Sequence, residues 1–344
     1  MRNWQKIREN PSLKETFLVR EQVIDGIRHF FKTHNFHEVD TPLLVKYPGT
    51  EPFLEVFETQ LKTAEGQSQR GFLITSPEFA LKKLLTAGLG NIFQICKAFR
   101  NNEGISSKHN PEFTMIEWYR VDADYNDIMR DCEQLLMSLN GGNKLTYQGR
   151  EYDLTSPWPR ISVAQAFQKY AQVDIDSLLS EEKLLAIGKQ KGYQVDSQTT
   201  WEQIYNQIFA NEIDPQLAKL NTPIIIYDYP VSQAALSRKK ISDPRFAERF
   251  EFFIGGIELG NAFSELNDAQ EQEARIDLDL QERKKLGKVD YGKDNDFILA
   301  LKTGMPNSAG IAVGVDRLVM LIADVSDISQ TIFFPATEIF GLDS

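Results

Sequence analysis

The segment between Phe99 and Tyr119 carries the densest group of side chains that could take part in chemistry. It contains the runs FRNNEG, HNPEFT and EWY. Side chains alternate between the faces of a strand, so Phe113, Glu117 and Tyr119 would share one face. That face would offer a ring that can stack on a base, a carboxylate and a phenol. Arg100, at the mouth of the preceding loop, could clamp a phosphate with its planar set of donors. Each residue alone is ordinary, but the joint spacing favours a nucleotide site.

A second group of polar side chains interrupts the apolar segment 249–265, RFEFFIGGIELGNAFSE. Glu251 and Glu258 are seven residues apart, which places them on opposite faces of a regular strand. A bulge at Gly255-Gly256 would return them to one face, where two carboxylates could hold Mg²⁺ against nucleotide phosphates. Further positions alternate onto a single face: Asn261, Phe263 and Glu265. Polar groups within apolar strands are costly without partners, so this segment favours function over packing.

The third segment, GIAVGVDRL at 310–318, alternates small and β-branched residues. Gly310, Ala312 and Gly314 would share one face and clear a floor on which a flat ligand can lie. The other face would enter the core with Ile311, Val313 and Val315. Arg317 would begin the next helix and could reach a triphosphate. A run of alternating small residues is also typical of close packing between a sheet and a helix. By itself, this segment is therefore only weak evidence for a ligand site.

Two helices and a strand are predicted ahead of these segments. Ser12–Glu15 has the pattern of a capping box and begins a helix that runs to about residue 33. Residues 36–44 have strand character, with a proline that ends the strand or confines it to an edge. A second helix is expected to begin with Ser76 as N-cap and Pro77 at the first helical position.

The remaining elements are mostly strands, separated by one helical region. Strands are predicted at 91–99, 111–120, 224–227, 250–259 and 310–315. The stretch at about 140–220 has mainly helical patterns and carries no cluster of site residues, which indicates a helical insertion. Strands that follow one another without βαβ alternation favour an α+β fold with an antiparallel sheet flanked by helices.

Composition limits the classes of protein that the chain can belong to. The formal charge is −11, from 49 acidic and 38 basic residues, so a large polyanionic partner such as tRNA is not expected. No run of about 18 apolar residues predicts a membrane span, and the N-terminus lacks the pattern of a signal peptide. Cys96 and Cys132 are too few for a disulfide framework or a zinc cluster. We therefore expect a cytoplasmic protein without membrane contact.

In their order and spacing, the three segments resemble the motifs of class II aminoacyl-tRNA synthetases. Residues 36–44 resemble the first motif of that class, through which its members form dimers. The resemblance implies that residues 1–344 form one catalytic domain with an insertion at about 140–220. It also implies a homodimer with an ATP-dependent, amino-acid-activating site. The run ELGNAFSELND at 258–268 resembles lysyl-tRNA synthetases in particular.

Other features resemble a smaller branch, the elongation factor P β-lysine ligases. Because the chain begins at the first catalytic helix, we expect no anticodon-binding domain. The runs EWY at 117–119, YPVSQA at 229–234 and GMP at 304–306 are similar to that branch. So is Ala312, where lysyl-tRNA synthetases have glycine. This resemblance implies lysine or (R)-β-lysine as substrate and elongation factor P as acceptor, whereas RFEFFIGG is more synthetase-like and leaves the amino acid open.

The resemblance also implies a role for each site residue, with ATP as co-substrate and Mg²⁺ as cofactor. The catalytic arginines that grip phosphates are Arg100 and Arg317. The Mg²⁺ ligands are Glu251 and Glu258. The other ATP-binding residues are Asn101, Asn102, Glu103, His109, Asn110, Phe113, Leu259 and Gly314, together with Glu258. The amino acid is bound by Ser76, Pro77, Glu78, Glu117, Tyr119, Asn261, Phe263, Glu265 and Ala312. In the loop, Asn102 stands where the class has glutamate and Glu103 follows it.

Two alternatives remain. A truncated lysyl-tRNA synthetase would carry out the same activation but charge tRNA. A regulatory relative would only sense amino acids, although the retained arginines and acidic pair argue against that.

Overall fold

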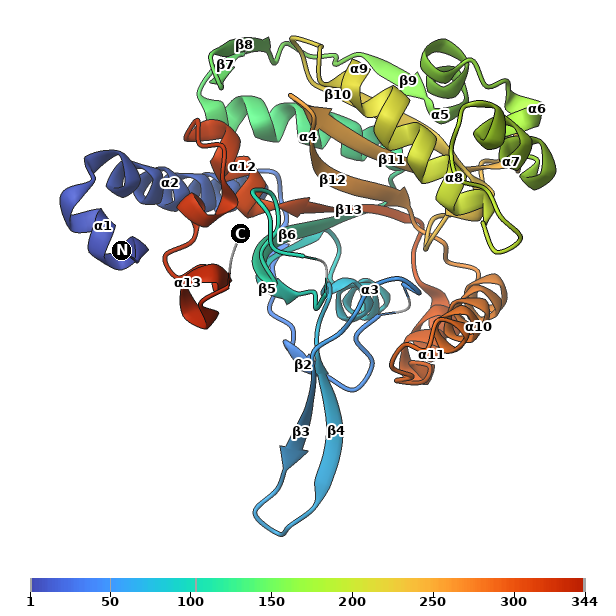
Figure 1. The fold of residues 1–344 in the computed structure, drawn as a ribbon. Helices are drawn as coiled ribbons and strands as arrows, with labels where there is room; N and C mark the ends of the chain where they lie inside the picture. Colours follow the sequence, from blue (N-terminus) through green and yellow to red (C-terminus); the bar gives the residue numbers. More distant parts are fainter. Residues whose placement is uncertain (1, 50, 103, 343–344) are drawn as a thin grey trace.

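A mixed sheet of eight strands forms the centre of the molecule (Figure 1). The computed structural model describes residues 2–49, 51–102 and 104–342. In spatial order the strands are β1 (His37–Glu38), β5 (Ile92–Phe99), β6 (Glu112–Val121), β13 (Ser308–Gly314), β12 (Ile257–Ser264), β11 (Phe246–Ile254), β10 (Ile224–Pro230) and β9 (Arg160–Ser162). The pairs β1–β5 and β9–β10 at the edges are parallel, and the inner pairs are antiparallel. The predicted α+β fold with an antiparallel sheet flanked by helices is confirmed, except that the two edge pairs are parallel.

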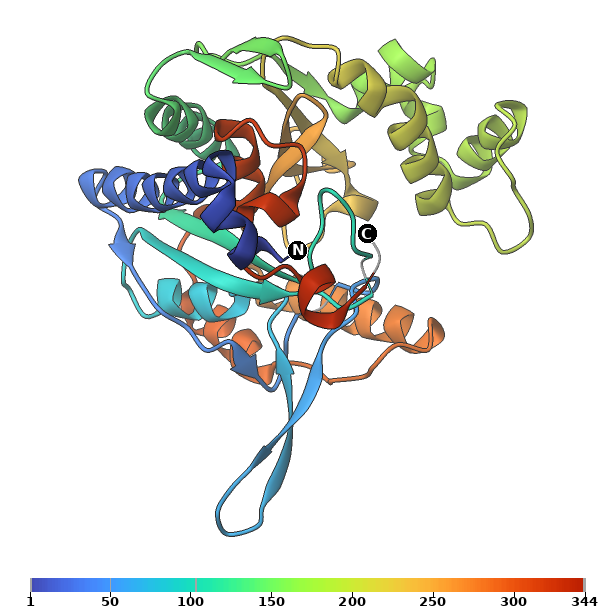
Figure 2. The same cartoon turned by 60° about the vertical axis from the view of Figure 1, so that its left-hand side comes forward.

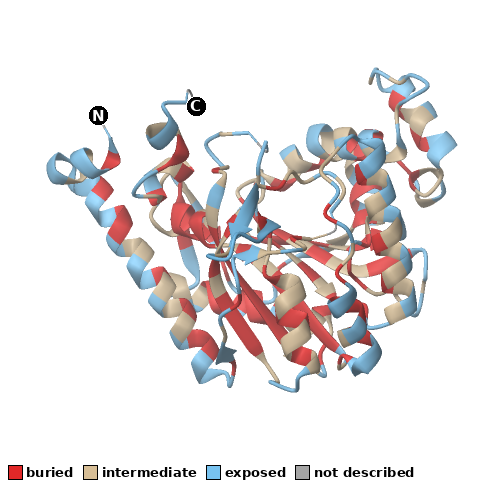
Figure 3. Ribbon diagram, turned by 90° about the horizontal axis from the view of Figure 1, so that it is seen from below, coloured by how far each residue is buried: buried red, intermediate tan, exposed pale blue. Residues whose placement is uncertain are grey.

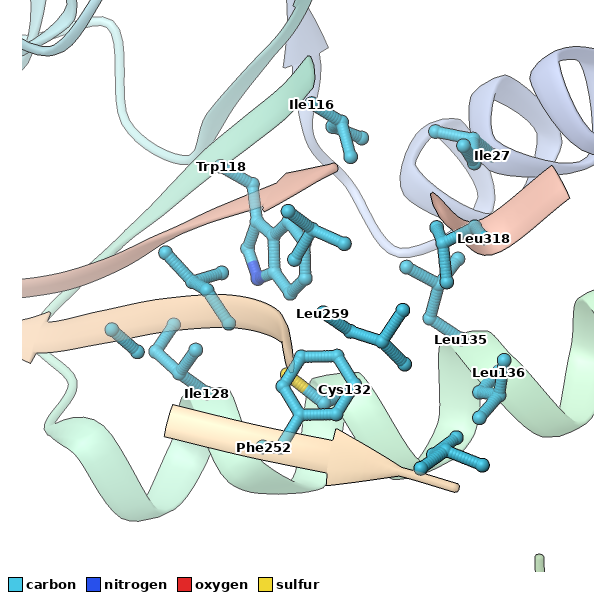
Figure 4. Close-up of a cluster of buried hydrophobic side chains, with 14 of the residues drawn as sticks. Ile27, Ile116, Trp118, Ile128, Cys132, Leu135, Leu136, Phe252, Leu259 and Leu318 are labelled. Atoms are coloured by element: carbon cyan, nitrogen blue, oxygen red, sulfur yellow. The ribbon is translucent and has the colours of Figure 1, made fainter. Parts of the chain in front are cut away.

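One face of the sheet is buried under helices. These are α2 (Pro11–Thr33), α4 (Tyr125–Asn140) and α12 (Val315–Ile322). Figure 4 shows the apolar cluster between sheet and helices, where Trp118 and Leu259 of the sheet meet Ile27, Cys132 and Leu318 of the helices. Because alternate residues of a strand point to opposite faces, the residues between these core positions must face the other side of the sheet.

The opposite face is covered only in part. Three helices pack over one end of it: α3 (Glu78–Thr86), α10 (Ala269–Lys285) and α11 (Asn295–Gly304). A small second sheet pairs β2 (Leu44–Val45) with β4 (Ser68–Leu73) and β4 with β3 (Glu58–Lys62). Its β3–β4 ribbon projects away from the body of the molecule (Figures 1 and 2). In Figure 3, the buried residues lie along the central strands and on the inward sides of the surrounding helices.

The first helix and the strand after it differ in detail from the sequence prediction. Helix α2 ends at Thr33 as expected, but its N-cap is Asn10, whose side chain accepts hydrogen bonds from the N–H groups of Ser12 and Leu13. The predicted capping box at Ser12 is therefore wrong, because Asn10 followed by proline provides the cap two residues earlier. Within 36–44, only β1 and the first residue of β2 pair as strands.

Helix α3 begins one residue later than expected. Its N-cap is Pro77, and the Oγ of Ser76 accepts a hydrogen bond from the N–H of Glu78 at 3.0 Å. Ser76 thus still satisfies a free N–H at the helix start. Gly88, just beyond the helix, has a φ of +83°, which suits glycine.

The region at about 140–220 begins with strands and continues with helices. The strands are β7 (Lys144–Tyr147), β8 (Arg150–Asp153) and β9. The β7–β8 hairpin was not predicted, because its turn at Gln148-Gly149 lacks the usual Asn-Gly signal, although both residues have positive φ. The α-helices that follow are α5 (Val163–Ala166), α6 (Ile175–Leu178), α7 (Glu181–Gln190), α8 (Trp201–Ile208) and α9 (Asp214–Leu217). They share a separate apolar core, which continues onto Ile224 and Phe253 of the sheet.

The first and last helices lie near each other (Figure 1). Helix α1 (Asn3–Glu9) approaches α13 (Ala336–Phe340), and Glu338 accepts hydrogen bonds at 2.8 Å from the N–H of Asn3. Among the described residues, no helix is both long enough and apolar enough to cross a membrane.

Candidate active site

The three segments singled out in the sequence meet in one cavity of about 330 Å³ on the open face of the sheet. The strand register explains how they meet. Ala312 of β13 pairs with Glu117 of β6 on one side and with Asn261 of β12 on the other. Asn261 in turn pairs with Glu251 of β11. Because paired residues point to the same face, these four side chains form a row across the cavity floor. A neighbouring row consists of Tyr119, Gly310 and Phe263.

The alternation predicted for β6 and β13 is confirmed. The positions expected to face the ligand all line the cavity, namely Phe113, Glu117, Tyr119, Gly310, Ala312 and Gly314. The positions expected to face inward belong to the main core, namely Ile311, Val313 and Val315. Arg317 lies in the first turn of α12, as predicted, and its side chain reaches the cavity.

Glu251 and Glu258 reach the same cavity by a different route from the one predicted. The segment 250–259 is not one strand, because Gly255-Gly256 forms the turn between β11 and β12 with φ values of +58° and +78°. Two consecutive positive φ values suit the tight turn of a hairpin. The register then shifts between Phe252 and Phe253, which leaves one extra residue on β12. The predicted bulge at the glycine pair is wrong, but a turn and a nearby bulge bring both carboxylates to one cavity.

Buried carboxylates cluster at one end of the cavity. Glu117 accepts hydrogen bonds from Ser76 Oγ at 2.6 Å and from the hydroxyl of Tyr119 at 2.9 Å. Lys82 Nζ lies 2.6 Å from a carboxylate oxygen of Glu78 and 2.5 Å from one of Glu265. Three acidic side chains therefore face a single lysine at this end, which leaves an excess of negative charge.

Burial and crowding change the proton affinity of these groups. Burial, followed by the charge of Glu78, raises the pKa of Glu117 to about 8. Burial also raises the pKa of Glu265, although Lys82 opposes the shift. For Lys82, burial by itself would lower the pKa, but Glu265 and Glu78 outweigh it and raise the pKa. The cluster would therefore gain from additional positive charge.

Positive side chains line other parts of the cavity. Arg317 donates to the carbonyl oxygen of Glu258 at 2.9 Å, and its guanidinium lies 2.9 Å from Nε2 of His109. The guanidinium of Arg100 lies 5.3 Å from the ring centre of Phe113, within range for a cation–π contact. Arg249 pairs with Glu251 at 2.7 Å and donates to the side-chain oxygen of Asn261 at 3.1 Å. Such an arrangement suits a ligand that combines phosphates with an aromatic base.

The acidic pair Glu251 and Glu258 fits a divalent cation. Desolvation in the cavity and the neighbouring charge of Glu251 raise the pKa of Glu258, although its side chain remains open to solvent, so the pair is short of positive charge. Carboxylate oxygens are the protein ligands that Mg²⁺ prefers. Among the described residues, no group of three or more His, Cys, Asp or Glu side chains could hold a metal ion. Phosphate and water oxygens would therefore have to complete the coordination of any Mg²⁺ held by this pair.

Most residues predicted for the site line the cavity, and a few lie elsewhere. Ser76, Glu78, His109, Asn110, Leu259 and Glu265 contribute to the lining in addition to those described above. Pro77 does not, because it caps α3. Asn101 and Asn102 are exposed outside the cavity, where the N–H of Asn101 donates to the carbonyl of Glu55. Glu103 lies outside the described residues. A role of Asn101, Asn102 and Glu103 in ATP binding stays a prediction.

Several lining residues were missed by the sequence analysis. They include Glu51, Lys108, Arg249, Met115, Gly260 and Ile328. Arg249 could have been found, because it lies two residues before Glu251 and therefore on the same face of the strand. Glu51 carried no such signal, since it belongs to an irregular segment. That segment is held in place by buried Arg283, which donates to the carbonyl oxygens of Glu51 and Leu54.

Gly310 is the floor position most sensitive to added volume. A Cβ atom there would lie 2.3 Å from the ring of Tyr119 and 3.0 Å from Glu265 Oε1. We expect Gly310→Ala to lower the free energy of unfolding by about 1–3 kcal/mol, measured by urea denaturation, because the buried ring must move. Gly314→Ala is the matched control, since its Cβ would meet only Arg317 at 3.7 Å. Equal stability of the two variants would contradict this prediction.

The fold and the convergence of the three segments define the catalytic domain of a class II aminoacyl-tRNA synthetase. Comparison with protein families agrees. Residues 2–338 match the family described as tRNA synthetases class II (D, K and N), and the chain belongs to this family.

Curated relatives that are named lysine–tRNA ligase match nearly the whole chain. The protein from Pelotomaculum thermopropionicum is 38% identical over 95% of this chain and 64% of its own length. That from Clostridium perfringens is 37% identical over 95% of this chain and 65% of its own length. That from Carboxydothermus hydrogenoformans is 36% identical over 95% of this chain and 66% of its own length. The chain thus spans 64% to 66% of the length of these relatives.

Proposed function

We propose that this protein uses ATP to activate lysine or (R)-β-lysine as an aminoacyl-adenylate and passes the aminoacyl group to a lysine side chain of elongation factor P. The observation that carries the proposal is the charge at the acidic end of the cavity. Among the described residues, Lys82 is the cation that pairs with Glu78 and Glu265, so two negative charges remain unmatched in the cluster when these two carboxylates and Glu117 are all ionised. A lysine isomer carries two ammonium groups and matches this excess, and the relatives' names also point to lysine.

The chemistry that follows needs no nucleophile from the protein. The carboxylate of the amino acid attacks the α-phosphate of ATP, and the bond to the leaving pyrophosphate breaks. Holding both reactants over one sheet replaces a bimolecular encounter, which supplies much of the rate. Arg100 and Arg317 stabilise the charge that develops on the phosphates. Mg²⁺ at Glu251 and Glu258 would neutralise further phosphate charge when bound.

Transfer then takes place at the carbonyl carbon of the adenylate. A neutral amine of the acceptor attacks this carbon, AMP leaves, and the amine loses a proton as the amide forms. The formal charge of −11 supports a protein acceptor over a polyanionic RNA. The similarity to proteins named lysine–tRNA ligase supports the alternative, in which the same adenylate is transferred to tRNA.

Transfer of labelled amino acid separates these acceptors. We expect labelled lysine or (R)-β-lysine to appear on elongation factor P and not on tRNA. Robust charging of tRNA without labelling of the protein would overturn the choice of acceptor. Absence of pyrophosphate exchange with every lysine isomer would overturn the activation itself and favour a regulatory relative.

We assign the preference between lysine and (R)-β-lysine to Ala312 in the pocket wall. Its methyl group stands between Glu117 and Asn261 in the cavity floor. One methyl group in a pocket wall discriminates by roughly 1–3 kcal/mol, which would favour an amine moved to the β-carbon. Exchange rates across a panel of lysine isomers test this assignment.

Lysine binding is expected to depend on pH through Glu117. With a pKa of about 8, Glu117 is largely neutral below that pH in the empty pocket, whereas an ammonium group pairs best with the ionised form. The apparent KM for lysine should therefore rise as the pH falls, by about tenfold for each pH unit below 8. Lysine-dependent pyrophosphate exchange at a series of pH values from about 6.5 to 8.5 measures this dependence of KM on pH. Glu117→Gln is the control and should flatten the profile; an unchanged slope in that variant would assign the effect to another group.

We also propose a homodimer, supported by the resemblance of residues 36–44 to the dimer-forming motif, and sedimentation velocity tests it. A cytoplasmic location is supported by Cys96 and Cys132, which are both buried as free thiols and so fit a reducing compartment.

A further inference from the structure

We propose that Lys82 is a positioning residue that fixes the charge of the acidic end of the cavity and aims Glu78 and Glu265 at the two ammonium groups of the substrate. No motif in the sequence pointed to Lys82. The inference rests on the proposed activation of a lysine isomer and adds the residue that makes the pocket selective for a diamine.

The geometry of Lys82 differs from that of an ordinary surface ion pair. Its side chain is 0% exposed, and its Nζ lies between Glu78 on its own helix and Glu265 at the end of β12. It contacts one oxygen of each carboxylate. The other oxygen of Glu265, Oε1, accepts no hydrogen bond within the described part of the chain, although Glu265 is 1% exposed and lines the cavity. Lys82 thus contacts each carboxylate through one oxygen, and Oε1 of Glu265 is left for the substrate.

Further titratable and charged groups face this pair. Glu117 and Tyr119 face it from β6, with the Tyr119 hydroxyl bonded to Glu117. Arg238 acts on Glu265 from a greater distance, and its own ion pair is with Glu248. Among the described residues, Lys82 is therefore the cation in direct contact with Glu78 and Glu265, while Glu117 is bonded to Ser76 and Tyr119. With Lys82 present, the excess charge is two, which matches a diamine; without it, the excess would be three.

A purely structural role is the competing explanation. A buried ion pair can fix one element against another, and breaking it leaves an uncompensated charge. Helix α3 offers a matched comparison at the next residue, because Lys83 also pairs with two carboxylates, Asp294 and Asp296, at 2.9 Å. Those partners lie outside the cavity lining, whereas Glu78 and Glu265 belong to it, so Lys83 forms a comparable ion pair without contact to the carboxylates of the pocket.

The test compares Lys82→Met and Lys82→Gln with Lys83→Met in lysine-dependent pyrophosphate exchange. Methionine keeps the length of an unbranched chain, and glutamine can still donate hydrogen bonds to a carboxylate. We expect both Lys82 variants to raise the KM for lysine at least tenfold, with the KM for ATP changed less than twofold. Without the positive charge of Lys82, the pKa values of the remaining carboxylates should rise. The KM for lysine, which falls as the pH rises, should therefore level off at a higher pH in the variants than in the wild type. Lys83→Met should leave both KM values and the pH profile unchanged.

Each result decides the matter. Folded Lys82 variants with unchanged lysine KM and pH profile would show a structural ion pair and overturn the inference. The same follows if both variants fail to fold while Lys83→Met folds. A wild-type protein without lysine-dependent exchange would instead overturn the proposed function, which is a separate outcome because it is read before any variant is compared.

Discussion

Replacement of Arg317 by alanine is expected to slow adenylate formation about 100- to 1,000-fold, the usual cost of removing one preorganised donor from a developing charge. Arg317 suits this role because its partners within the described chain are the carbonyl oxygens of Lys108 and Glu258 and a ring nitrogen of His109. Neutral acceptors fix the guanidinium without cancelling its charge, so the charge remains available for phosphates. The effect should appear in kcat, because the negative charge grows toward the transition state.

Single-turnover formation of the adenylate measures this effect directly. Arg317→Lys should recover only part of the rate, since an ammonium group cannot reproduce a planar pair of donors. Arg130→Ala is a suitable control, because Arg130 is largely exposed on α4 and pairs with Asp127 in its own helix. A loss of less than threefold in Arg317→Ala would remove Arg317 from the catalytic machinery.

Replacement of Glu258 by glutamine is expected to lower the rate of adenylate formation at least about 100-fold and to raise the Mg²⁺ concentration needed for half-maximal rate. Glutamine keeps the size of the side chain and removes the charge that attracts a hard cation. Because Glu258 is exposed on β12 and lines the open cavity, the neutral side chain of the same size should not disturb packing, and the variant should fold normally.

Initial rates at a series of Mg²⁺ concentrations test this expectation, together with thermal unfolding as a check on the fold. Glu151→Gln is the control, since Glu151 is exposed on β8 and is not part of the cavity lining. An unchanged Mg²⁺ requirement in Glu258→Gln would place the metal elsewhere, and the acidic pair would then need another explanation.

Errors in the sequence analysis arose where two local structures share one pattern. The run from Phe250 to Leu259 has the apolar character of a single strand, yet Gly255-Gly256 turns it into a hairpin. Apolar content does not reveal chain reversal, since both arms are buried on the same sheet. The hairpin at 144–153 was missed for a related reason, because its turn residues carry a weak signal.

The sequence by itself determined which side chains share a face. Alternation along a strand is a local property of the backbone, so Glu117 and Tyr119, or Gly310 and Ala312, could be assigned to the cavity side without knowledge of the fold. Family motifs then added an expectation for the chemistry. Both kinds of information are contained in short stretches of chain.

Only the tertiary structure decided which of these faces meet. The row Glu117–Ala312–Asn261–Glu251 depends on strand order and register, which are set by packing between segments up to 195 residues apart in this sequence. The same holds for Lys82, whose two partners lie four and 183 positions away along the chain. Burial shifts the pKa values of these groups and leaves some of their charge without a partner. Because burial depends on the whole folded chain, no local sequence pattern contains it.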